Sequence, residues 1–351
     1  MGGEAAFCFE IFNETTEKLL YTGIKGLIQD RMRLLKTFAS HDEQITILQN
    51  RGLLVPDKAA ARRILSRENY YALIDGYKEP FLEGDERINP YGLEQYQKGT
   101  EFGHIYALYR FDRELRMLLL NELLKFEKNI KSKVAYRFSE KFKETDSFLE
   151  LDHYSPKSEH HHERDRIVST LANLIKSHKK RDRVRYPAIR EFFDKHRHVP
   201  LWVLVNFLSL GQITNFYSVI DEDLRERIAQ DFADEFSEEY EPIRLKASEL
   251  DAILRIAFPY RNKSAHEEVL YRFHLTHPEE LTDVEASLRL SKGDLGRGTV
   301  YSMVGLLRLL LAREEYVVFS QDLERLLANL KTELPGRAYG VVMRETGIRV
   351  N

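Results

Sequence analysis

A single hydrophobic stripe constrains the fold of this chain more than any other feature of its sequence. Between positions 115 and 142, apolar side chains recur at steps of 4, 4, 3, 4, 4, 4 and 4 residues, at Leu115, Leu119, Leu123, Phe126, Ile130, Val134, Phe138 and Phe142. Steps of three and four residues place these side chains on one face of an α-helix. The other faces are rich in lysine and arginine, so the sequence predicts one long amphipathic helix.

Helical spacing also dominates the rest of the chain. It occurs at 43–51, 57–66, 166–178, 201–210, 224–232, 248–257, 301–314 and 321–330. Alternating runs typical of strands are few, and the two candidates, 51–56 and 70–81, fit either a local strand pair or turns. We therefore predict an all-α fold.

Glycine and proline divide the chain, because neither residue fits well inside a helix. Both are frequent between residues 76 and 99, and again after Thr276. We predict an N-terminal helical region with an irregular connector at 1–100, a helical core at 101–334 and a loosely held C-terminal tail at 335–351.

Charge, cysteine content and apolar stretches argue against a uniformly basic nucleic-acid-binding protein, a disulfide-bonded secreted protein and a membrane-spanning protein. The 53 lysines and arginines nearly balance the 56 aspartates and glutamates, for a formal net charge of −3, so only a local patch could attract a nucleic acid. The single cysteine, Cys8, has no partner for an intramolecular disulfide, which fits a reducing compartment. The N-terminus lacks the features of a secretory signal, and the apolar stretches 199–211 and 304–312 are shorter than the ~20 residues of a membrane helix. We expect a soluble, cytoplasmic protein that does not bind membranes.

The most basic local patch lies between Lys176 and Arg190. Tyr186 stands within it, and an aromatic ring among cations is suited to stacking on a nucleic-acid base. A solvated surface is the alternative, since runs of charge usually form one. We favour RNA binding, and the predicted RNA contacts of this patch are Lys179, Lys180, Arg181, Arg183 and Arg185.

One short motif indicates catalysis. Arg261, Asn262 and His266 follow a helical pattern and place a permanent cation five residues from an imidazole, a group that ordinarily titrates at ~6.5. On a straight helix five residues turn a side chain by ~500°, so Arg261 and His266 would point ~140° apart. Either a kink at Pro259 or a twofold dimer that pairs two copies of the segment would bring them to one phosphate.

Such a pair suits RNA cleavage by the 2′-hydroxyl, because histidine transfers protons near neutral pH and arginine holds a phosphate. Asn262 lies four residues before His266, from where it would orient the imidazole or bind the phosphate. Neither role requires a metal, and we expect no cofactor. The alternative is an arginine in a salt bridge and a histidine that is merely exposed.

The head of the long helix carries four charged candidates. Asp112 and Arg116 stand at an i, i+4 spacing, which is expected to stabilise the helix locally. Arg110 and Arg113 are better candidates for RNA binding, as the lining of a phosphate groove.

Three further features have structural interpretations. Trp202 is expected in the core, and Gly211 is expected to cap the C-terminus of the helix at 201–210. The consecutive histidines at 160–162 are expected in an exposed loop, because they cannot all face one ion on a helix. No metal site is predicted.

Five segments resemble the Abi-like abortive-infection proteins of bacteria, of the AbiD and AbiF type. They lie at 34–57, 69–81, 108–138, 200–217 and 261–273, of which the third begins LYRFDRELR and the last reads RNKSAHEEVLYRF. That family is placed in the HEPN superfamily, whose members are helical and often cleave RNA without a metal through an Arg-polar-x-x-x-His motif at a dimer interface.

The resemblance implies a HEPN-like helical bundle over the core, with an additional N-terminal helical region, and a homodimer. Carried over residue by residue, the motif assigns catalysis to Arg261, Asn262 and His266, and Arg272 becomes a further candidate for RNA binding. Two departures from the family pattern are Pro259 and Glu267, which stands where a second histidine is common.

Two functions from different classes follow. The first is a metal-independent endoribonuclease of anti-phage abortive infection, which cleaves RNA by 2′-hydroxyl attack and has a regulatory non-coding RNA as a second expected partner. The alternative is a non-catalytic RNA-binding or dimeric interaction module, which Glu267 favours because a carboxylate beside the imidazole repels phosphate. An antitoxin-like partner of another enzyme is a third interpretation.

Overall fold

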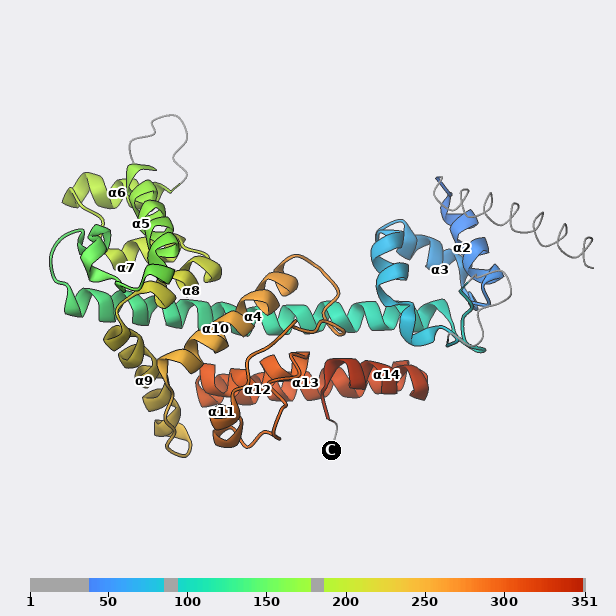
Figure 1. Ribbon diagram of the computed structural model, residues 1–351. Helices are drawn as coiled ribbons and strands as arrows, with labels where there is room; N and C mark the ends of the chain where they lie inside the picture. The colour runs from blue at the N-terminus through green and yellow to red at the C-terminus, as the bar shows by residue number, and fades with distance from the viewer. Residues whose placement is uncertain (1–37, 85–93, 178–185, 350–351) are drawn as a thin grey trace, which may run out of the picture. The chain divides into compact units, whose positions relative to one another are not determined.

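The computed structural model describes residues 38–84, 94–177 and 186–349, and its longest element is α4 (Phe102–Lys141), a helix of 40 residues (Figure 1). Seven of the eight positions of the predicted stripe, from Leu115 to Phe138, form its buried face and have no exposed surface, whereas Phe142 follows the end of the helix and is half-buried. The prediction of one long amphipathic helix is thus confirmed. The helix begins well before Leu115 because Phe102, Ile105 and Leu108 continue the same spacing and are also buried.

The all-α prediction is confirmed as well. No strand is present in the described ranges, where extended pairing is limited to three isolated bridges. The candidate strand at 51–56 contributes one of them, between Leu54 and Glu101. The candidate at 70–81 forms helical turns instead, a π-turn at Tyr71–Asp75 and a 3₁₀ turn at Glu79–Phe81.

The chain separates into two compact units. The first comprises Met1–Arg110 with Glu333–Tyr339, and the second comprises Phe111–Thr332 with Gly340–Asn351. The division by contacts falls at Arg110, inside α4. The domain bounds predicted from glycine and proline stay a prediction.

In the first unit, two short helices begin at side chains that cap them. Ser40 and Glu43 form a reciprocal capping box at the start of α2 (His41–Asn50), where the Ser40 N–H donates to the Glu43 carboxylate at 2.7 Å. Asp57 accepts from the Ala60 N–H at 2.8 Å at the start of α3 (Lys58–Leu65). Leu48 and Leu73 are fully buried in the core of this region.

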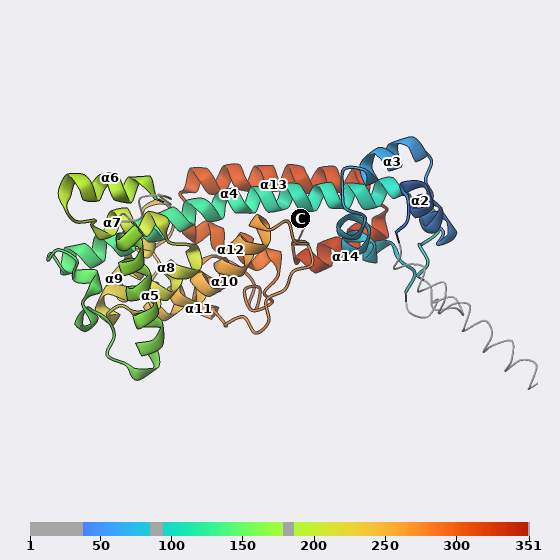
Figure 2. The ribbon, with the colours of Figure 1, turned by 90° about the horizontal axis from the view of Figure 1, so that it is seen from above.

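In the second unit, helices surround the rest of α4 (Figures 1 and 2). Short 3₁₀ turns at 147–160 lead into the first of them. In chain order the helices are α5 (His161–Lys176), α6 (Pro187–His196), α7 (Leu201–Leu204), α8 (Leu210–Val219), α9 (Glu222–Glu239), α10 (Ala247–Ala265), α11 (Thr282–Ser287), α12 (Val300–Leu310) and α13 (Arg313–Glu333). The helix α10 packs against α8, α9 and α12, and α5 packs against α8.

The predicted helix at 201–210 is two helices. A 3₁₀ turn at Val205–Phe207 follows α7, and Ser209 then starts α8 by accepting from the Gln212 N–H at 3.3 Å while its own N–H donates to the Gln212 side chain at 2.8 Å. Gly211 therefore lies in the first turn of α8 and does not cap a C-terminus. A Cβ at Gly211 would stand 2.7 Å from the Phe258 ring, so close packing explains the glycine.

Two other expectations also differ from the structure. Trp202 was expected in the core, but 58% of it is exposed, because the single turn of α7 buries Leu201 and Leu204 and turns Trp202 away from them. The segment expected as a loose tail contains the helix α14 (Gly336–Thr346), in which Ala338 and Val342 are buried. Within the described ranges, no helix has both the length and the apolar character that crossing a bilayer requires.

Gly298 offers a sharp test of the packing beside α10. Its φ of +59° is left-handed, and an added Cβ would stand 2.8 Å from the Leu275 Cβ and 3.0 Å from its backbone nitrogen. We expect Gly298→Ala to lower the free energy of unfolding by about 2–4 kcal/mol, measured by denaturant titration. Gly296→Ala is the matched control, since its nearest contact would be at 3.7 Å. Equal stability of the two variants would contradict this account.

Candidate functional site

The helix α10 carries the Arg261, Asn262 and His266 motif at its C-terminal end. It begins where the Lys246 N–H donates to the Glu249 carboxylate at 2.8 Å. The predicted pattern at 250–257 is its buried face, with Leu250, Ile253, Leu254 and Ala257 fully buried. The helix continues through Pro259 in a single run to Ala265, so the proline does not start a new helix.

Tyr260 fixes α10 beside the motif. Its side chain is fully buried, and its hydroxyl donates to the Gly298 carbonyl at 2.7 Å. Burial raises the pKa of Tyr260, because the phenolate would lose its hydration, and the hydroxyl therefore stays a donor. This hydrogen bond fixes the rotation of α10 about its own axis at Tyr260. The next residue, Arg261, is half-buried.

A buried carboxylate of α4 orients Arg261. The Arg261 Nε lies 3.1 Å from the Glu127 Oε2, and the Lys131 Nζ lies 2.6 Å from the Glu127 Oε1. Glu127 is only 6% exposed. Two cations thus share one carboxylate, which leaves the cluster with a net positive charge. Among the described residues, the Nη1 and Nη2 atoms of Arg261 have no hydrogen-bond partner, so these donors remain available to an anion.

His266 stands at the C-terminal cap of α10. Its backbone N–H donates to the Asn262 carbonyl at 3.0 Å, and its side chain is exposed. Glu267, with a φ of +56°, then turns the chain out of the helix in the left-handed conformation. The structure places Arg261 and His266 on one helix, but within the described ranges they share no hydrogen-bond partner.

The Asp112–Arg116 pair holds the segment that follows the motif. Asp112 is fully buried, and its carboxylate accepts from the Arg116 Nη1 at 2.7 Å, from the Leu270 N–H at 3.0 Å and from the Tyr271 N–H at 2.7 Å. The Arg116 Nη1 also donates to the Glu268 carbonyl at 3.3 Å. A pair expected to stabilise α4 locally therefore ties α4 to the backbone just beyond His266.

The other predicted RNA-binding residues have different settings, and five of them lie outside the described residues. Arg110 belongs to the first unit, where its Nη2 lies 2.8 Å and 2.9 Å from the two Glu333 carboxylate oxygens. Arg113 is an exposed residue of the second unit, and Arg272 is half-buried directly after Tyr271. The cluster Lys179, Lys180, Arg181, Arg183 and Arg185 lies outside the described residues. RNA binding by all of these side chains stays a prediction.

The three consecutive histidines open α5 and have separate neighbours. The His161 Nε2 lies 3.2 Å from the Pro156 carbonyl, and the His162 Nδ1 lies 3.3 Å from the Glu163 carboxylate. In the described part of the chain, no three histidine, cysteine, aspartate or glutamate side chains are grouped so that they could hold a metal ion.

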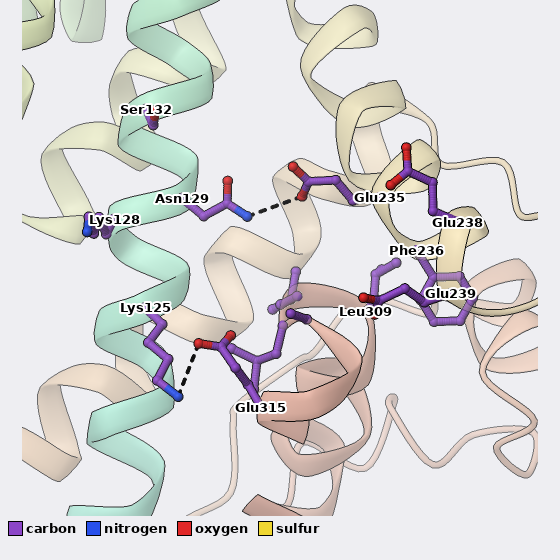
Figure 3. Close-up of a pocket in the computed structure, with 13 residues that line it drawn as sticks. Lys125, Lys128, Asn129, Ser132, Glu235, Phe236, Glu238, Glu239, Leu309 and Glu315 are labelled. Carbon is purple, nitrogen blue, oxygen red and sulfur yellow. Dashed lines mark hydrogen bonds and ion pairs between the residues drawn. The ribbon is translucent and has the colours of Figure 1, made fainter. Parts of the chain in front are cut away.

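Two hollows lie on either side of the exposed residues Lys128 and Ser132 of α4, which line both of them. The first, of about 530 Å³, faces α9, α12 and α13 (Figure 3). Its wall is acidic, with side chains that include Glu235, Glu238, Glu239 and Glu315. The Asn129 Nδ2 lies 3.3 Å from Glu235 and the Lys125 Nζ lies 3.3 Å from Glu315, and Figure 3 marks both contacts by dashed lines. The second hollow, of about 540 Å³, faces α7, and its lining includes two aromatic side chains, two lysines and the carboxylate of Glu140.

Comparison with known proteins identifies the family. Residues 63–272 match the protein family described as Abi-like protein. The chain belongs to this family. The matched range contains all of α4, all of α10 and the backbone that Asp112 holds, and the predicted recognition of the Abi-like family is confirmed. Searches of curated proteins and of solved structures gave no match.

Two residues of the site escaped the sequence analysis. Glu127 and Lys131 have the i, i+4 spacing of an ordinary helix pair. What distinguishes them is the contact of Glu127 with Arg261, which is 134 positions away in the chain. The spacing was visible, but no local pattern indicates such a distant partner.

The tie at Asp112 is expected to be worth much more than a surface ion pair. Asp112→Ala would remove the carboxylate that pairs with the buried Arg116 guanidinium and accepts from two buried backbone N–H groups, which costs about 3–5 kcal/mol in free energy of unfolding. The control is Asp223→Ala, which breaks the exposed pair with Arg227 and should cost no more than about 1 kcal/mol. Thermal unfolding of both variants checks this, and similar midpoints would refute it.

Proposed function

We propose that this protein is a metal-independent endoribonuclease of the HEPN type that acts in anti-phage abortive infection. Membership of the Abi-like family indicates the role in abortive infection. The observation that carries the enzymatic proposal is Arg261, a guanidinium oriented through Nε by a buried carboxylate, with both Nη atoms available and an exposed imidazole on the same helix.

The reaction uses the RNA's own nucleophile. A base removes the proton from the 2′-hydroxyl, the O2′–P bond forms and the P–O5′ bond breaks, while an acid protonates the leaving O5′. The products are a 2′,3′-cyclic phosphate and a 5′-hydroxyl. His266 transfers one of these protons, and Arg261 neutralises the phosphate as charge develops on its oxygens. Asn262 lies beside Arg261 on α10, where its amide supplies a further hydrogen bond.

A second copy of the chain completes the site in this proposal. Side chains five positions apart on a helix diverge by ~140°, and α10 is continuous from Arg261 to Ala265. One copy therefore does not aim both groups at one phosphate. A homodimer with a twofold axis near α10 lets Arg261 of one copy serve the phosphate at His266 of the other.

The alternative is a non-catalytic RNA-binding or dimeric module. The feature that favours it is Glu267, whose carboxylate follows His266 directly and adds negative charge where a phosphate would bind. A regulatory non-coding RNA would be the partner of such a module, and would restrain the nuclease in the first proposal.

Cleavage in the presence of EDTA tests the enzyme. Labelled single-stranded RNA should be cut to fragments that end in a cyclic phosphate, and His266→Ala should lower the rate by about 10²-fold or more. His162→Ala is the matched control, because His162 is also highly exposed and its rate should equal that of the parent. Cleavage that requires added Mg²⁺, or that survives in His266→Ala, would rule out the proposal.

Glu127 acts in this mechanism as a positioning residue. Glu127→Gln keeps the shape of the side chain but removes the charge that orients Arg261. We expect kcat to fall about tenfold while KM stays the same or falls, because the cluster becomes more positive and still attracts RNA. Glu222→Gln is the control, since Glu222 pairs with Lys157, which belongs to none of the proposed sites. A rise in KM with unchanged kcat would show that Glu127 does not orient the reacting groups.

A further inference from the structure

Trp202 is presented to solvent on a fixed backbone. Its neighbours Leu201, Leu204 and Val205 are buried, while 58% of Trp202 is exposed. The Asn206 side chain donates to the Trp202 carbonyl at 2.8 Å and so holds the short helix α7 closed. A large apolar ring kept in water on a rigid support is unusual for a side chain with only a packing role.

Tyr136 of α4 lines the same hollow as Trp202. The hollow of about 540 Å³ lies between the outer face of α4 and the turn formed by α7 and Val205, and Figures 1 and 2 both place α7 beside the C-terminal half of α4. Tyr136 is 62% exposed, and the Arg137 guanidinium lies 5.4 Å from the centre of its ring. Two exposed aromatic side chains thus line one concave surface.

The charges of this hollow suit an anion. Its lining carries two lysines, Lys128 and Lys131, against one carboxylate, Glu140. Lys131 is joined through Glu127 to Arg261, at 2.6 Å and 3.1 Å, which links the hollow to the proposed phosphate clamp. The hollow on the other side of Lys128 carries four glutamates against two lysines (Figure 3), so its excess negative charge repels phosphate. A negatively charged strand that reaches Lys128 is therefore directed towards the hollow with the aromatic side chains.

We propose that this hollow is a base-stacking subsite for single-stranded RNA, with Trp202 and Tyr136 as its platforms and Lys128 on the adjacent phosphate. The assignment rests on the proposed function, since it supplies the substrate of the Arg261 site. Unpaired bases expose the faces that stack on aromatic rings, whereas the bases of a duplex are already stacked on one another. The subsite therefore selects single strands and tolerates different base sequences.

The sequence contains one tryptophan, so tryptophan fluorescence reports on Trp202 alone. The full chain carrying His266→Ala, which leaves the RNA intact, is titrated with a 12-nucleotide oligoadenylate, and with the same strand annealed to oligouridylate. We expect the single strand to quench the emission and the duplex to leave it nearly unchanged. Fluorescence anisotropy of the labelled strand gives the Kd in parallel.

Substitutions separate stacking from charge. Trp202→Ala should raise the Kd for the single strand about tenfold without changing its dependence on salt, because a stacked base is lost but no phosphate contact. Trp202→Phe, which keeps a ring, should stay within about threefold of the parent. Lys128→Ala should lower the slope of log Kd against log salt by about one. The matched control is Tyr71→Ala, which removes an exposed aromatic side chain of the first unit and should have no effect.

Each outcome decides between the two proposals. If RNA is bound, and is cut in EDTA, while Trp202 emission stays constant, the stacking subsite is overturned but the nuclease proposal is supported. Quenching by RNA without cleavage by the parent protein would support the subsite and overturn the nuclease. A third outcome is that the emission shifts with protein concentration alone and that the Trp202→Ala variant sediments as a monomer. This surface would then be an interface between copies of the chain, and the subsite would be overturned. An absence of RNA binding would overturn both.

Discussion

The buried carboxylate of Asp112 is the interaction on which the candidate site depends. It stands on α4, the helix with the longest apolar face, and accepts hydrogen bonds from a guanidinium and two backbone N–H groups. A buried charge is tolerated only when its hydrogen-bonding capacity is satisfied, and here the two backbone donors belong to the segment beyond α10. The exit of the chain from the motif helix is therefore set by a residue far away in sequence.

A second carboxylate of α4, that of Glu127, contacts the first residue of the motif. Glu127 lies about four turns beyond Asp112, roughly 22 Å along the helix axis, and contacts Arg261. The rigid helix thus carries two acceptors at a fixed separation, one for the catalytic candidate and one for the backbone that follows it. The same helix continues to Lys128 and Tyr136, so the proposed phosphate clamp and the aromatic hollow share one supporting helix.

Local periodicity was sufficient to predict the helices, because burial of one face imposes it. The stripe from Leu115 to Phe138 and the pattern from Leu250 to Ala257 are buried as their spacing required. The Ser209 and Gln212 capping box was also visible in the sequence, and would have placed the start of α8 correctly. Trp202 was misassigned because a helix of one turn is too short for its spacing to show which side is buried.

The long-range polar contacts could not be predicted in this way. Asp112 and Arg116 have the spacing of a local pair, and so do Glu127 and Lys131, yet each pair includes a side chain that bonds to a segment more than 130 positions away. Hydrophobic spacing reports which face of an element is covered, but not which element covers it. The family resemblance identified the motif residues, whereas the structure was needed to show that Glu127 contacts Arg261 and that Asp112 holds the backbone beyond α10.

The left-handed backbone at Glu267 has a consequence for how His266 is presented. A residue with a side chain costs about 1–2 kcal/mol in that conformation, whereas glycine adopts it without strain. Glycine, however, would widen the range of directions that the peptide after the imidazole can sample. Glu267 has a side chain at φ +56°, so this position carries a small conformational strain. In return, the backbone directly after the His266 imidazole samples fewer conformations than a glycine would allow.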